Sequence, residues 1–176
     1  MTQKAFYAGR VTSLLVIAVL VAQTPLVAQR EFGAVSEELV GKPAPPIALE
    51  LVSGKRFDLA RQKGKVVFLA FWATWCEPCR RDIPRLLAAE ANFKDLVVVG
   101  VSPEPRADVI EYLKQERFDF ASAIDLDERV SKAYGVDLVP RLFVIDQKGI
   151  VVRMIRGLPG ERTIRQTLET LLPRGK

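Results

Sequence analysis

The chain has no histidine and only two cysteines among its 176 residues. Without an imidazole it cannot use Cys–His nucleophilic catalysis, histidine-ligated zinc or copper, or haem attachment through Cys-x-x-Cys-His. Two cysteines are also too few for a cysteine-rich zinc site within one chain. We therefore expect no metal site and no cofactor, and we expect the two cysteines to act as a pair.

Long basic stretches are missing as well. The formal net charge is +5, but the 26 lysines and arginines are interspersed with 21 acidic residues. Such mixed charge is typical of a solvated surface and not of a nucleic-acid-binding stripe. We expect no nucleic acid partner. The length fits one domain preceded by a short additional segment.

The first 29 residues have the pattern of an export signal. Lys4 and Arg10 precede an apolar run over residues 11–22, and a polar break follows it. This order of a basic and an apolar region is that of a signal peptide, although the run is shorter than the roughly 20 residues that span a bilayer. We predict a signal peptide or signal anchor over residues 1–29, with residues 11–22 as the anchor of an uncleaved form. The body would then lie in the periplasm or at the outer face of the cytoplasmic membrane.

Residues 47–176 predict an α/β domain, and the Pro-rich residues 30–46 before it predict a linker or extended entry. Two runs, 65–72 (KVVFLAFW) and 95–101 (DLVVVGV), are almost entirely apolar, as in strands buried on both faces. The order of elements predicts a mixed central sheet flanked by helices, with an N-terminal β-hairpin. Further strands are expected at 47–51, 56–59, 142–146 and 150–156, and helices at 77–91, 106–116, 127–134 and 161–172.

The two cysteines lie where the first buried strand gives way to a helix. The first amides of a helix are unpaired and carry the positive end of its dipole, so a thiolate at Cys76 would be stabilised there. Two intervening residues, one of them Pro78, let Cys79 reach Cys76 and resolve a mixed disulfide. The alternative is a structural staple, but so small a loop would contribute only about 2 kcal/mol. The pattern favours a redox pair.

The segment FWATWCEPCR, residues 71–80, resembles the active-site segment of thioredoxins. It resembles more closely that of the extracytoplasmic TlpA/ResA-like thiol–disulfide oxidoreductases. Pro84, five residues after the second cysteine, and Val139-Pro140, just before a strand, also resemble positions of this superfamily, the latter its cis-proline. The resemblance covers about residues 38–172 and implies a thioredoxin-like fold.

This resemblance implies a set of roles. Cys76 would attack the disulfide of a client protein, such as apocytochrome c, and Cys79 would resolve the mixed disulfide. A membrane thiol donor would then reduce the pair again, so the protein would take part in cytochrome c biogenesis. The residues expected to contact the substrate are Trp75, Pro78, Val139 and Pro140.

Three positions depart from the family pattern or refine it. Thioredoxins have an acid six residues before the first cysteine, where this chain has Ala70, so Glu77 becomes the candidate for moving the proton of the resolving thiol. A carboxylate next to Cys76 also opposes thiolate formation, which favours a reducing pair over a strong oxidant. Arg141 follows Pro140, where it would either favour acidic partners or face the solvent.

Other functions remain as alternatives. A peroxiredoxin needs a threonine three residues before its cysteine, and Ala73 stands there. A thiol pair could also bind copper(I) in a metal chaperone. A thioredoxin-fold oxidase or a module that only binds partners would use the same fold. The intact cysteine pair favours the protein-disulfide oxidoreductase.

Overall fold

A computed structural model describes residues 36–172 of the chain, and the predicted export signal over residues 1–29 lies outside them. Five strands form the central sheet in the order β5-β4-β3-β6-β7, and β1 and β2 form a separate hairpin. The strands are β1 (Ala48–Glu50), β2 (Arg56–Asp58), β3 (Val66–Phe71), β4 (Leu96–Ser102), β5 (Ser122–Ile124), β6 (Arg141–Ile145) and β7 (Val151–Arg156). The helices are η1 (Leu59–Gln62), α2 (Glu77–Asn92), α3 (Arg106–Glu116), α4 (Arg129–Ala133) and α5 (Glu161–Leu171).

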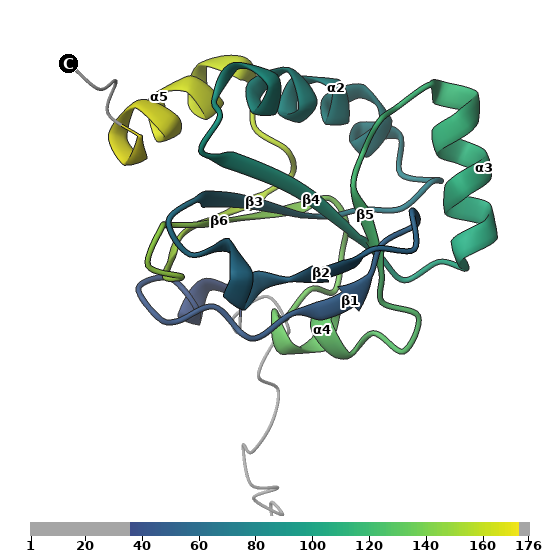
Figure 1. Ribbon diagram of the computed structural model, residues 1–176, viewed down its shortest axis with the longest axis horizontal. Coiled ribbons are helices and arrows are strands. Elements are labelled where there is room, and N and C mark those ends of the chain that lie inside the picture. The colour runs from purple at the N-terminus through teal and green to yellow at the C-terminus, as the bar shows by residue number, and fades with distance from the viewer. Residues whose placement is uncertain (1–35, 173–176) are drawn as a thin grey trace, which may run out of the picture.

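The predicted mixed sheet and N-terminal hairpin are confirmed. Strands β3, β4 and β5 run parallel, whereas β6 and β7 are antiparallel to their neighbours. Helices α2 and α5 cover one face of the sheet, and the hairpin and α4 lie over the other (Figure 1). This is the thioredoxin-like arrangement that the sequence predicts.

Strand β3 lies at the centre of the sheet, and each of its six residues is buried. Val66, Phe68 and Ala70 join the core beneath α2, α3 and α5. The residues between them, Val67, Leu69 and Phe71, join the core on the hairpin side. Alternate side chains of a strand point to opposite faces, so a strand covered on both sides is apolar throughout. The chain leaves the end of this strand to form the loop with the cysteines.

The described part of the predicted entry segment is hydrogen-bonded to the domain. The Ser36 hydroxyl donates to the carbonyl oxygens of Tyr134, at 2.8 Å, and Gly135, at 2.7 Å. The Gly41 N–H donates to the Val151 carbonyl at 2.7 Å, which places residues 41–44 alongside the start of β7. None of the helices within residues 36–172 is long and apolar enough to cross a bilayer.

Candidate active site

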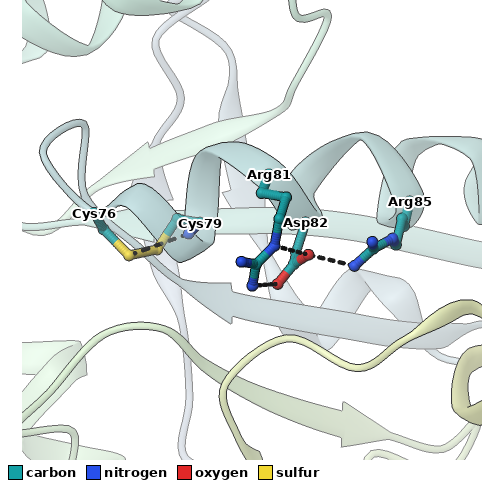
Figure 2. Close-up of polar contacts among 5 residues, drawn as sticks. All are labelled: Cys76, Cys79, Arg81, Asp82 and Arg85. Atoms are coloured by element: carbon teal, nitrogen blue, oxygen red, sulfur yellow. Dashed lines mark hydrogen bonds and ion pairs between the residues drawn. A yellow bond between two sulfur atoms is a disulfide. The ribbon is translucent and has the colours of Figure 1, made fainter.

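Cys76 and Cys79 form a disulfide at the start of α2, with an S–S distance of 2.05 Å (Figure 2). Cys76 is the residue that caps the helix, and the Cys79 N–H donates to its Sγ at 3.3 Å. Cys79 is completely buried, whereas Cys76 is 3% exposed. The first backbone N–H groups of α2 and the positive end of its dipole lie at the cap position. Both favour a thiolate on the Cys76 sulfur after reduction.

The predicted substrate-contacting residues lie at the same end of the sheet as this disulfide. Trp75, directly before Cys76, is 73% exposed, and Pro78 lies on the surface in the first turn of α2. The Val139–Pro140 peptide bond is cis. Val139 packs against the buried cluster that contains both cysteines. Because Phe71 pairs with Arg141, the Val139–Pro140 segment lies alongside the end of β3. The structure therefore brings these side chains from two distant segments to one end of the sheet.

Trp72 belongs to the same buried cluster as the two cysteines. Its side chain is completely buried, and its Nε1 donates to the Ser122 Oγ at 2.9 Å, so it contributes a hydrogen bond as well as packing. Its ring lies 5.5 Å from that of Phe120. Gly100 makes room for both, because a Cβ there would lie 2.6 Å from the Trp72 Nε1 and 2.7 Å from the Phe120 ring.

The carboxylate of Glu104 fixes the loop that leads to the disulfide. It accepts the Thr74 N–H at 2.7 Å and the Thr74 hydroxyl at 2.6 Å. The Ser102 hydroxyl also donates to it, at 3.0 Å. Sequence reasoning missed Glu104, because it follows β4 and lies 30 residues from Thr74, with no local pattern that connects the two.

Asp82 is a second carboxylate that sequence reasoning missed. It is 4% exposed, and it lies on α2 three residues after Cys79, between Arg81 and Arg85 (Figure 2). The Arg81 Nε donates to it at 3.1 Å, and the Arg85 Nη1 donates to the same oxygen. The sequence does contain a signal for this residue. Asp82 lies next to Ile83 on the apolar side of the helix, the side that includes Cys79, and a carboxylate at such a position is unexpected unless it is paired.

Glu77, the acid predicted to move a proton, lies on the outer surface. Its side chain is 81% exposed, and its carboxylate is 3.6 Å from the Arg80 Nη1. Cys79, in contrast, is completely buried. The structure thus directs the carboxylate of Glu77 to solvent beside Cys76, and it provides Asp82 as the buried acid on the helix.

Arg141 does not face the solvent, which excludes one of the two alternatives given for it. It is 3% exposed, and its Nη2 donates to the Asp137 Oδ1 at 2.7 Å. Its Nε and Nη1 have no hydrogen-bond partner within the described residues. Leu142, the next residue of β6, belongs to the core with the cysteines, and alternation along the strand therefore directs Arg141 to the opposite face.

Within residues 36–172, no group of three or more His, Cys, Asp or Glu side chains is placed to hold a metal ion. The site around Cys76 and Cys79 is suited to thiol–disulfide exchange, because it combines two sulfurs, a helix N-terminus and an exposed aromatic ring.

Comparisons with known proteins agree with this chemistry. A family model described as the AhpC/TSA family matches residues 40–154. The thiol–disulfide oxidoreductase ResA of Bacillus subtilis (strain 168) is 36% identical over 137 residues, which cover 76% of this chain and 76% of ResA. ResA of Geobacillus thermodenitrificans (strain NG80-2) is 34% identical over 138 residues, or 76% of this chain and 79% of that protein. A thiol:disulfide interchange protein from Chlorobium tepidum TLS has a crystal structure that matches with a TM-score of 0.66 and 30% identity, over 74% of this chain and 95% of that one.

Proposed function

The chain belongs to the AhpC/TSA family and to the ResA-like thiol–disulfide oxidoreductases, and from this premise we propose that it reduces disulfides of client proteins outside the cytoplasm. One observation carries the proposal: a disulfide caps the N-terminus of α2, directly after an exposed Trp75. The export pattern of the first 29 residues supports the location.

The proposed reaction transfers two electrons to the client. In the reduced protein the Cys76 thiolate attacks one sulfur of the client disulfide, and the other client sulfur leaves as a thiolate. Cys79 then loses its proton and attacks the Cys76 sulfur. This step releases the client as a dithiol and leaves the disulfide between Cys76 and Cys79. A thiol donor at the membrane would return the pair to its reduced form.

The proton of Cys79 needs an acceptor, because this thiol has no contact with water. We propose Asp82, which is buried one helical turn further along α2, as that acceptor. Glu77 would act differently. Its exposed carboxylate beside Cys76 opposes the thiolate by like-charge repulsion, and this supports a reducing pair.

The surface around the pair would bind the client. Trp75 and Pro78 offer exposed apolar groups on one side of the disulfide. On the other side, the backbone of Val139 and Pro140 would lie against an extended client segment. Apocytochrome c before haem attachment is one client of this kind.

Cysteine variants and the reduction potential test the proposal. We expect Cys76→Ser to abolish turnover of a disulfide-bonded peptide, whereas Cys79→Ser should still attack and should accumulate a mixed disulfide that mass spectrometry detects. The wild-type potential should lie near or below the roughly −270 mV of thioredoxin. A potential near −120 mV would show an oxidant, and turnover that survives both substitutions would refute the role of the pair.

A further inference from the structure

A groove of about 330 Å³ lies beside the disulfide, between the cysteine loop, the first turn of α2 and one side of α3. Trp75 forms the end next to Cys76. A client segment that delivers its cysteine to Cys76 would therefore pass close to this groove. The side chains that matter for its chemistry are Trp75, Arg80, Asp108, Glu111, Tyr112 and Glu116.

The groove is negatively charged, although the whole chain has a net charge of +5. Arg80 is the one base that lines it, and its Nη2 already donates to Glu116 at 2.7 Å. Asp108 and Glu111 have no cationic partner within residues 36–172. Glu111 accepts only a neutral hydrogen bond there, from Gln115 at 3.1 Å. Two carboxylates in the groove are thus available to an incoming cation.

A buried hydroxyl without a partner provides a second, independent observation. Tyr112 lines the groove and is 9% exposed, and its hydroxyl has no hydrogen-bond partner within the described residues. Burial raises the pKa of Tyr112 and the charge of Glu116 raises it further, while the neighbouring Arg80 acts in the opposite direction. The neutral hydroxyl can both donate and accept a hydrogen bond. A buried polar group left unpaired is destabilising, and a ligand that pairs with it recovers this cost.

Arg80 lies over the ring of this tyrosine. Its guanidinium carbon lies 5.8 Å from the centroid of the Tyr112 ring, and its side chain is 45% exposed. An arriving cation would compete with Arg80 for Glu116. Release of Arg80 toward solvent would then open the Tyr112 hydroxyl to the ligand.

We propose that this groove binds a lysine or arginine of the client next to its reactive cysteine, so that the protein selects disulfides flanked by basic residues. The inference rests on the proposed function, since it concerns the client of the same site. The cation would pair with Asp108 and Glu111, and its aliphatic stem or guanidinium would lie against the exposed face of Trp75.

The test compares two disulfide peptides that differ only in a basic or a neutral residue beside the cysteine. Exposed charge pairs contribute up to about 1 kcal/mol, so Asp108→Asn/Glu111→Gln should lower kcat/KM for the basic peptide roughly fivefold. Turnover of the neutral peptide and of hydroxyethyl disulfide should not change. The matched control, Glu161→Gln/Glu169→Gln, removes the same charge from α5 and should leave both peptides unaffected.

Two results would overturn the proposal: equal use of both peptides by the wild type, or a preference for the basic peptide that persists in the Asp108→Asn/Glu111→Gln variant. Hydroxyethyl disulfide separates this failure from failure of the proposed function. If the wild type does not reduce it, the function itself is wrong. The groove is then tested by equilibrium binding of the basic peptide with serine in place of cysteine, which the double variant should bind roughly fivefold more weakly.

Discussion

Asp137→Asn should destabilise the protein although Asp137 lies at the surface. Asp137 holds the guanidinium of Arg141, with 2.7 Å between the Nη2 and the Oδ1. The Arg141 side chain is 4% exposed, whereas that of Asp137 is 38% exposed. Removal of the carboxylate therefore leaves a positive charge in the interior, where two of its nitrogens already lack partners within the described residues.

Loss of one partner from a buried ion pair costs about 3–5 kcal/mol. Water can reach the position of Asp137 and replace part of the lost interaction, so we expect the free energy of unfolding to fall by about 2–3 kcal/mol. For a domain of this size, such a loss corresponds to a decrease in Tm of roughly 5–10 °C. Urea unfolding of the oxidised protein measures it.

Two further variants isolate the cause. Arg141→Met removes the buried charge itself, so the double variant Asp137→Asn/Arg141→Met should be more stable than Asp137→Asn alone. Asp127→Asn is the matched control, because Asp127 is 57% exposed and pairs with an Arg129 that is 80% exposed. It should change the free energy of unfolding by less than about 1 kcal/mol. A double variant as unstable as Asp137→Asn would refute the explanation by buried charge.

Two other predictions concern the acids near the disulfide. Asp82→Asn should slow the attack of Cys79 on the mixed disulfide by about tenfold or more, and it should alter the pH profile of this step in stopped-flow measurements. The matched variant Glu77→Gln should leave the step unchanged. Equal effects of the two would show that the buried carboxylate is not the proton acceptor. Glu104→Gln keeps one acceptor for Thr74, so the free energy of unfolding measured by urea denaturation should fall by about 1.5 kcal/mol. An unchanged free energy would show that this contact does not hold the loop.

Sequence reasoning succeeded where the signal is local and periodic. Each predicted strand and helix is present, with ends that differ by at most two residues, as in α2, expected over 77–91 and observed as Glu77–Asn92. The continuous apolar run at 65–72 predicted a strand covered on both faces, and β3 is buried at every position. The cysteines could be placed at a helix N-terminus because only two residues lie between them and a strand directly precedes them.

Sequence reasoning failed where a contact joins residues far apart in the chain. Glu104 and Thr74 meet because β3 and β4 run parallel as neighbours, which brings the ends of both strands to one edge of the sheet. Arg141 is buried because its position in β6 directs it into the core on the hairpin side. Neither residue type nor spacing contains this information.

The sequence by itself indicated the chemistry: a close cysteine pair without histidine, in a segment that resembles thioredoxin active sites, favours disulfide exchange. A strand followed by a helix places the thiol at the positive end of a dipole. Only the tertiary structure decided which carboxylates are buried, which are exposed and which face the groove of α3. The physical reason is that hydrogen-bonding and hydrophobic patterns act over a few residues, whereas the solvation and pairing of a charge depend on every segment that packs around it.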